Sequence, residues 1–225
     1  MAKQSRASVT RIPLSRERVL QAAMNLADER GLEALSMRKL AQELGVEAMS
    51  LYNHVENKDD IVDGILDLVT AEIELAPAET DWKAALRANA ISRHEAYRRH
   101  PWAPRVWMTS TKVTSVRLAL GDAMLRSLRE AGFPKELIYH AYHTLDGYVL
   151  GFTLQEGNFP HSAEELKELA GSFLRDFPAH EYPDLAEHIE QHIDPPQREG
   201  GSFELGLDLI LDGLERLRDT DGGHG

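Results

Sequence analysis

Residues 36–58 read SMRKLAQELGVEAMSLYNHVENK, and this stretch decides the fold of the N-terminal part of the chain. Ser36 is a good N-cap for a first short helix, and Gly45 ends that helix. The apolar residues recur at helical spacing and would face one another across the turn: Leu40, Ala41, Leu44, Val46, Leu51 and Val55. Two short helices joined through a glycine, with their apolar sides together, predict a helix-turn-helix.

The face of the second short helix (residues 47–54) opposite its apolar side carries groups that can bind DNA. Its side chains can hydrogen-bond to bases or touch a thymine methyl, as readout of the major groove requires. Arg38 can reach a base edge or a phosphate, and Lys58 lies where the next helix begins, a position that favours an anion. An ordinary helical hairpin with a polar outer face is the alternative. The candidate DNA-binding residues are Arg38, Met49, Ser50, Tyr52, Asn53, His54 and Lys58.

The rest of the chain also carries helical periodicity, capping residues and helix-breaking Pro and Gly, and no stretch alternates with the period of a strand. The chain is therefore predicted to be all-α, with an N-terminal three-helix DNA-binding domain and a C-terminal helical domain. Helices are expected over residues 15–31, 36–44, 47–54, 57–76, 81–99, 111 or 114–131, 134–156, 162–176, 184–191 and 202–218.

Composition narrows the functional classes. The chain has 225 residues and no cysteine, which excludes disulfides, thiolate zinc sites and a cysteine nucleophile. No segment is long and apolar enough for a membrane helix, and the N-terminus does not read as a secretory signal, so a cytoplasmic protein is expected. The net charge is −12, yet residues 1–60 hold nine Lys/Arg and nine Asp/Glu. A basic N-terminus on an acidic body suggests that only one end meets a polyanion.

Residues 35–46 and 51–58, together with the preceding helix, resemble the DNA-binding domain of the TetR family of bacterial repressors. The ending Leu-Tyr-x-His-Val-x-x-Lys is the most specific part of the resemblance. It implies a nucleoid-associated homodimer that places two recognition helices in successive major grooves of a palindromic operator. It also implies base contacts from Arg38, Met49, Tyr52 and Asn53 and phosphate contacts from Ser50, His54 and Lys58, with Tyr52 sharing this second role.

The resemblance does not carry over the operator sequence. Ala48 stands where the tetracycline-repressor branch has a glutamine that reads a base. Arg6, Arg11 and Arg16 in and beside the basic N-terminal segment would lie next to the duplex and could add phosphate or minor-groove contacts, each of which steepens the salt dependence of binding. A plain disordered leader is the alternative for this segment.

The C-terminal part resembles the tetracycline-repressor-like branch at two helices, residues 134–152 and 202–218. In that branch the two helices and their symmetry mates form the core of the dimer, an isologous contact. The alternative is that both apolar stripes are buried within the single chain. The candidate interface residues are Ile138, Leu145, Phe152, Leu207, Ile210 and Leu214.

A cavity for a small-molecule effector, possibly aromatic or apolar, is expected between these helices. Asn89 falls where the branch has an amide that holds its drug, but Trp107 and Arg93 replace its metal-binding histidine and a phenylalanine. Tetracycline–magnesium is therefore not the expected ligand. Each aromatic residue could equally fill the core. The candidate ligand-binding residues are Asn89, Arg93, His94, Trp102, Trp107, Met108, Tyr142, Asp146 and Tyr148.

The expected organisation follows the chain in order. It comprises a flexible basic arm (1–14), the helix-turn-helix domain (15–60), a connecting helix (61–76), the ligand-binding and dimerisation domain (77–219) and a disordered tail (220–225). The function expected is a ligand-responsive regulator that represses transcription and is released from DNA by its effector.

Other chemistries find less support. His140, His143 and Asp146 share a spacing of three on a helix, so a metal-sensing DNA-binding regulator is the alternative function. Arg98 stands where a zinc-protease motif beginning at His94 would need its second histidine. No nucleophile elbow, phosphate loop or dinucleotide fingerprint is present, so neither an enzyme nor a cofactor is predicted.

Overall fold

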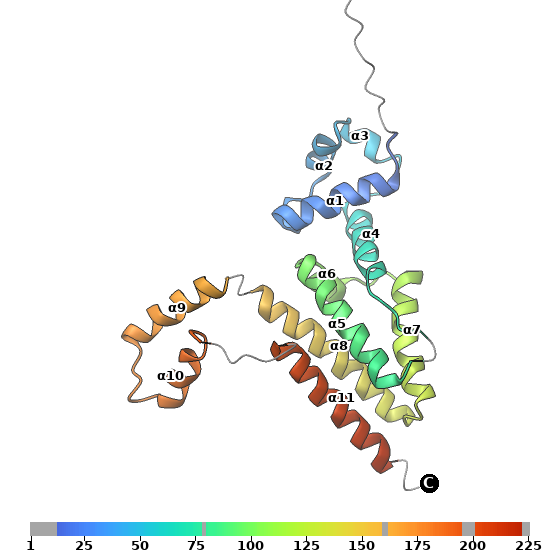
Figure 1. The fold of residues 1–225 in the computed structure, drawn as a ribbon. Helices are drawn as coiled ribbons and strands as arrows, with labels where there is room; N and C mark the ends of the chain where they lie inside the picture. The colour runs from blue at the N-terminus through green and yellow to red at the C-terminus, as the bar shows by residue number, and fades with distance from the viewer. Residues whose placement is uncertain (1–12, 78–79, 159–161, 195–200, 222–225) are drawn as a thin grey trace, which may run out of the picture.

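The computed structural model describes residues 13–77, 80–158, 162–194 and 201–221, and over these residues the chain contains helices and no strand, as predicted. Figure 1 shows the helix-turn-helix at one end and a bundle of longer helices at the other. The elements are α1 (Arg16–Arg30), η1 (Leu32–Ala34), α2 (Met37–Leu44), α3 (Ala48–Leu51), α4 (Lys58–Ala71), α5 (Trp82–Arg99), α6 (Ala103–Thr109), α7 (Ser115–Glu130), α8 (Lys135–Gly157), α9 (Ala163–Asp176), α10 (Pro183–Glu190) and α11 (Gly201–Asp221).

The head of the molecule comprises α1, α2, α3 and the first turns of α4. The Ser36 side chain accepts a hydrogen bond from the backbone N–H of Lys39, and Gly45 ends α2 with φ 66°, a left-handed conformation that favours glycine. Gly64 allows α4 to cross α1 closely, because a Cβ at this position would come within 2.7 Å of the Leu20 side chain. The two helices therefore hold each other at a fixed crossing point.

The body of the molecule comprises α5, α7, α8 and α11, and α4 joins it to the head. α5 packs against α4, α7, α8 and α11, so it is the central helix of the bundle. α4 also packs against α6 and α7, which places its C-terminal half inside the body. A movement of α7 or α6 can therefore reach the head through α4.

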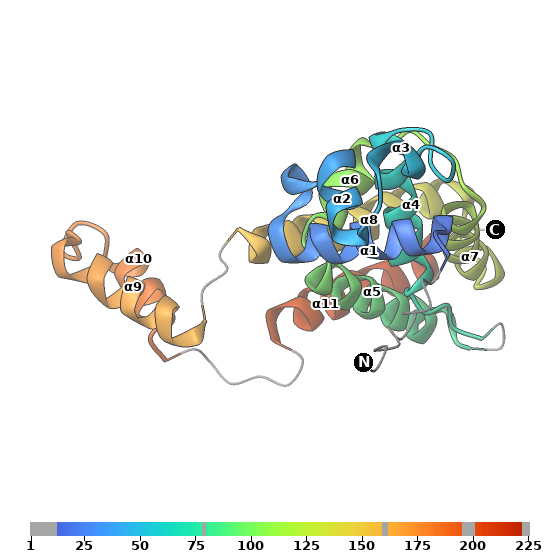
Figure 2. The ribbon, with the colours of Figure 1, turned by 90° about the horizontal axis from the view of Figure 1, so that it is seen from above.

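Helices α9 and α10 pack against each other and stand away from the bundle (Figures 1 and 2). Ser162 and Glu165 form a capping box that begins α9, so the predicted N-cap is confirmed. Large apolar side chains on this α9–α10 hairpin are exposed: Leu169, Phe173, Tyr182 and Leu185. The hairpin thus presents apolar surface that its own chain does not cover.

Three predicted helix ends were wrong, those of α4, α3 and α11. α4 ends at Ala71 and not near Ala76, because Ser92 accepts a hydrogen bond from the Glu74 N–H and Asn89 donates one to the Glu74 carbonyl. These tertiary bonds replace the helical ones just before a proline. α3 ends at Leu51, since Asn53 N–H donates to the Ser50 carbonyl in a tighter turn.

α6 was not predicted, and it begins at Ala103 with a proline in its first turn, where a missing N–H costs nothing. α11 continues to Asp221, into the segment predicted to be a disordered tail. Most of the predicted basic arm, including Arg6 and Arg11, lies outside the described residues. No helix within the described ranges is long and apolar enough to cross a membrane.

Candidate DNA-binding surface and effector site

The seven candidate DNA-binding residues belong to α2, α3, the turn after α3 and the start of α4, all within the head. Met49 is 74% exposed and Tyr52 47% exposed, and the other five are exposed or half-buried. Among the described residues, none of these seven side chains has a hydrogen bond or ion pair within the chain. Their polar groups are therefore available to an external partner, and we call this surface the reading face.

Buried apolar residues and a helix cap hold the reading face in position. Leu51 at the end of α3 and Val55, four residues later, are buried in the core of the head. The Asn57 side chain accepts a hydrogen bond from the Asp60 N–H at 2.9 Å and so caps α4. This cap fixes the position of Lys58, the first residue of that helix.

Arg16 has a partner within the chain, which the sequence did not reveal. Its guanidinium donates two hydrogen bonds to the Asp60 carboxylate, at 2.7 and 2.9 Å, and a third to the His54 carbonyl at 3.2 Å. The hydrogen bond from Arg16 lowers the pKa of Asp60 well below its ordinary value. Arg16 therefore ties the start of α1 to the start of α4, immediately behind the reading face.

A row of three carboxylates on α4 joins the head to the body. Lys112 contacts Asp60 at 3.2 Å, and Arg117 contacts Asp63 at 3.1 Å and Asp67 at 2.7 Å. Asp60, Asp63 and Asp67 follow one another at helical spacing, so they share one side of α4. Ion pairs therefore attach α4 to the segment between α6 and α7 and to the start of α7.

Trp102 lies at a second junction between head and body, and not in the cavity described below. Its ring N–H donates to Asp28 of α1 at 2.7 Å. The His100 ring lies between Asp28, at 2.8 Å, and Glu72, at 3.2 Å. These polar contacts hold the end of α5 against α1 and the end of α4.

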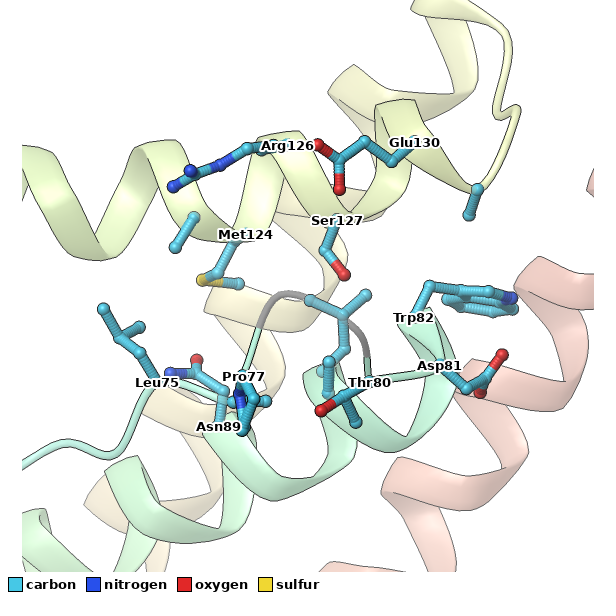
Figure 3. Close-up of a pocket in the computed structure, with 15 residues that line it drawn as sticks. Leu75, Pro77, Thr80, Asp81, Trp82, Asn89, Met124, Arg126, Ser127 and Glu130 are labelled. Carbon is cyan, nitrogen blue, oxygen red and sulfur yellow. The ribbon is translucent and has the colours of Figure 1, made fainter.

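A cavity of about 430 Å³ lies between α5, α7 and the segment before α5 (Figure 3). Its volume falls in the range of small-molecule sites. Of the nine predicted ligand-binding residues, Asn89 alone lines it. Its other walls come mainly from Leu75, Pro77, Thr80, Asp81, Trp82, Leu86, Met124, Arg126, Ser127 and Glu130.

Asn89 is almost fully buried in the cavity wall. Its amide N–H donates to the Glu74 carbonyl at 3.1 Å, while its amide oxygen has no partner among the described residues. Buried polar atoms normally have a hydrogen-bond partner. Asn89 therefore carries an unsatisfied buried acceptor beside this end of the cavity.

Four other predicted ligand-binding residues lie close together at the centre of the body. Arg93 donates to Asp146 at 2.6 Å, and its guanidinium lies 5.6 Å from the ring centre of Trp107. Tyr142 is half-buried beside them, one helical turn before Asp146 on α8. Trp107 also borders a smaller, more open cavity of about 260 Å³ together with Arg117.

The remaining three candidates have other positions. His94 stacks on Phe203 with ring centres 3.9 Å apart, and the Tyr148 hydroxyl donates to the Phe203 carbonyl at 2.8 Å. Both residues therefore fasten α11 to α5 and α8. Met108 is 63% exposed on α6 and lines neither of the two cavities.

Four of the six predicted interface residues are buried within the single chain. Ile138 and Leu145 of α8 and Leu207 and Leu214 of α11 are at most 8% exposed. They form the contact between these helices and the rest of the bundle, which is the alternative that periodicity left open. Phe152 and Ile210 are half-buried. The outer sides of the two helices expose Tyr139, Leu209 and Leu217 instead.

The metal-site alternative is wrong for the described part of the chain. No three His, Asp or Glu side chains there lie close enough together to hold a metal ion. His140 and His143 are exposed on α8, whereas Asp146 turns inward to Arg93. A spacing of three along a helix rotates each successive residue by 300°, so the third member leaves the shared face.

Comparison with known proteins identifies both halves of the chain. Residues 19–65 match the family described as bacterial regulatory proteins, tetR family, and residues 76–218 match the tetracyclin repressor-like C-terminal domain. The chain belongs to the TetR family of transcriptional regulators. The first match ends within α4 and the second begins between α4 and α5. The relatives of the chain are named as regulators of transcription, as expected for a chain that is not an enzyme.

Relatives of this TetR-family chain align over most of its length. The HTH-type transcriptional repressor DrrR1 of Streptomyces coeruleorubidus is 35% identical, with 91% of this chain and 78% of DrrR1 covered. The class A tetracycline repressor from transposon 1721 of Escherichia coli is 31% identical, covering 89% of this chain and 90% of the repressor. Both comparisons extend through the helix-turn-helix and the body.

Solved structures with the same fold include one with a small molecule. Apo ActR from Streptomyces coelicolor has a TM-score of 0.75 and 28% identity, over 93% of this chain and 99% of ActR. ActR in complex with actinorhodin has a TM-score of 0.73 and 27% identity, over 92% of this chain and 99% of ActR. The fold is thus one that holds a DNA-binding head and a ligand-binding body together.

Proposed function

We propose that this chain is a ligand-responsive transcriptional repressor that binds a palindromic operator as a homodimer and is released by a small-molecule effector. The reading face carries the proposal, because its seven side chains are exposed or half-buried and have no partner among the described residues. Such groups can contact base edges and phosphates without first breaking internal bonds. A repressor of this kind works in the bacterial cytoplasm, bound to the nucleoid.

Dimerisation follows from the size of the head. One short recognition helix makes too few base contacts for a selective site, whereas two heads about 34 Å apart read two half-sites. A partner chain would cover the outer sides of α8 and α11, where Tyr139, Leu209 and Leu217 are exposed. The exposed apolar residues of the α9–α10 hairpin would rest on the partner as well.

The effector would act through α4. The cavity lies between α5 and α7, and α7 grips α4 through Arg117. A ligand that shifts α7 would tilt α4 and with it the reading face, and so change the separation of the two heads. A preference of about 3 kcal/mol for the tilted state lowers operator affinity by up to about 150-fold.

DNA binding is tested by fluorescence anisotropy with fragments of the chain's own upstream region, as a function of salt. Lys58→Ala should weaken binding and reduce the log–log salt slope by about 2 for the dimer, since each phosphate contact contributes about 0.9. Lys135→Ala, at an equally exposed lysine at the start of α8, is the matched control and should change neither quantity.

Tyr52→Ala should weaken binding to the selected fragment more than binding to random DNA, because this residue also lies near bases in the proposed complex. If Tyr52→Ala and Lys58→Ala both bind like the unmodified chain, or if the chain is monomeric at micromolar concentration, the proposed function is rejected.

A further inference from the structure

Arg93, at the centre of the body, is a cation with more hydrogen-bond donors than hydrogen-bond partners. Arg93 is 1% exposed, and one of its terminal nitrogens donates to Asp146 at 2.6 Å. The nearest partner of its other terminal nitrogen is the Met124 sulfur, at 4.0 Å, a weak acceptor. Its Nε–H has no partner among the described residues. Arg93 can therefore form further hydrogen bonds with an added acceptor.

The surroundings of Arg93 add another donor and aromatic walls. The Tyr97 hydroxyl is buried and without a hydrogen-bond partner among the described residues. Burial raises the pKa of Tyr97, so the hydroxyl keeps its proton. The guanidinium lies 5.8 Å from the Tyr97 ring centre and 5.6 Å from that of Trp107. This environment suits an aromatic molecule that carries an acceptor group, preferably an anion.

Met124 is the connection between Arg93 and the cavity. The Met124 side chain lines the cavity and also contacts Arg93. It therefore lies between the cavity and the guanidinium. Methionine is flexible and can change rotamer to open a passage. Asn89, one helical turn before Arg93 on α5, has a free acceptor in the same wall, and Figure 3 shows Asn89 and Met124 at the end of the cavity away from Trp82. A ligand in this cavity therefore lies beside Asn89, and it reaches the Arg93 guanidinium, which does not line the cavity, once the Met124 side chain has moved.

Asp146 occupies the place that an external anion would take. Its side chain is 23% exposed, against 2% for Arg93, so Asp146 can move into solvent while Arg93 cannot. Charges at the mouth of the cavity are mixed, with Asp81 and Glu130 of one sign and Arg126 of the other. The single buried cation is thus the strongest determinant of the charge of the ligand.

We propose that the effector is an aromatic molecule with an acidic group, and that this group displaces the Asp146 carboxylate from Arg93. The inference rests on the proposed function, because it takes the cavity as the effector site. Displacement of Asp146 would release α8 from α5 at the centre of the bundle. The alternative is a structural ion pair that a ligand never opens.

The test uses 6-hydroxy-2-naphthoate and its neutral counterpart 6-hydroxy-2-naphthamide as probes, titrated into the purified full chain by calorimetry. The carboxylate should bind at least about tenfold more tightly than the amide, because it alone forms a charge-assisted bond. Asp146→Asn should tighten carboxylate binding by about a further tenfold and leave amide binding unchanged, since the internal competitor is weakened. Asp184→Asn, at an exposed aspartate of α10 that lines neither cavity, is the matched control and should change neither affinity.

Folding is controlled by thermal unfolding of each variant. Asp146→Asn leaves a buried cation unpaired, so the carboxylate probe should raise its Tm by more than it raises that of the unmodified chain. The double variant Arg93→Gln with Asp146→Asn carries no buried charge and should bind both probes equally.

Equal affinity of the two probes for the unmodified chain, no binding of either at millimolar concentration, or weaker carboxylate binding by Asp146→Asn would each overturn the inference. Operator binding is measured separately without probes. An intact operator complex alongside any of these outcomes rejects the acidic effector and leaves the repressor standing. Charge-selective probe binding without operator binding rejects the repressor and leaves the acidic effector standing.

Discussion

The reading face and the centre of the body treat polar groups in opposite ways. On the reading face, Arg38, Tyr52 and Asn53 are exposed and have no partner within the described chain. At the centre of the body, Arg93 is buried and already paired with Asp146. Binding of DNA to the reading face would displace only water from these groups. A ligand at Arg93 would have to compete with the Asp146 carboxylate. In the proposed function, this difference would let one chain bind a long polyanion outside and select a small molecule inside.

The largest effect on stability should come from breaking the Arg93–Asp146 ion pair at the centre of the body, which we call the inner pair. Arg93→Met leaves Asp146 without its cation and should lower the free energy of unfolding by about 3 kcal/mol, measured by urea denaturation. Adding Asp146→Leu to the same chain should restore most of the loss, because no unpaired charge remains. A loss below about 1 kcal/mol in the single variant would mean that the centre of the body is less sensitive to charge than we infer.

On the reading face the opposite pattern is expected. Met49→Ala should change stability by less than about 0.5 kcal/mol, since the side chain is 74% exposed. It should nevertheless weaken operator binding by about 1 kcal/mol, or about fivefold, because an apolar contact to bases is lost. Met108→Ala, at the exposed methionine of α6, is the control. A similar loss of operator affinity in both variants would show that exposure alone does not define the reading face.

The junction between the two regions gives a third test. Trp102→Phe removes the hydrogen bond to Asp28 and should cost about 1 kcal/mol of stability. It should not change naphthoate binding, because Trp102 does not line the cavity. Trp82→Phe alters the cavity wall and should change naphthoate binding. If Trp102→Phe has the larger effect on the probe, the effector site lies nearer the head than we propose.

The smallest effect concerns pH and the support behind the reading face. Arg16 lowers the pKa of Asp60 in the folded chain, so ionised Asp60 adds stability above about pH 4, the ordinary aspartate value. This contribution is lost as the pH falls toward the lower folded-state pKa. Asp60→Asn should therefore destabilise the chain at pH 7 and have progressively less effect toward pH 3, measured by urea unfolding at each pH. A constant difference across this range would contradict the ion pair as its cause.

The candidate residues of the reading face follow from a local sequence motif, whereas the Arg93–Asp146 pair does not. Ser36, Gly45 and Leu51 act within one local motif, so spacing alone locates the exposed side chains next to them. Arg93 and Asp146 were both candidates for ligand contact, but they are 53 residues apart and their pairing depends on how α5 meets α8. No local pattern encodes that crossing.

The apolar stripe of α8 shows the same limit. Its period of three and four correctly predicts a helix with one buried side, and Leu145 is indeed buried. Periodicity does not say whether that side meets another helix of the same chain or a second copy. α6 lies between two predicted helices and begins with Pro104 in its first turn, a position where proline is compatible with a helix.

The three aspartates on α4 and their cationic partners have a consequence for physiology. Lys112 and Arg117 hold α4 through contacts that are partly open to solvent, and attraction between such charges is screened as ions accumulate. The mechanical link from effector to DNA should then soften when a cell takes up potassium under osmotic stress. Operator binding itself also weakens as salt rises, so the response to effector in the proposed repressor would depend on ionic strength through both the head and α4.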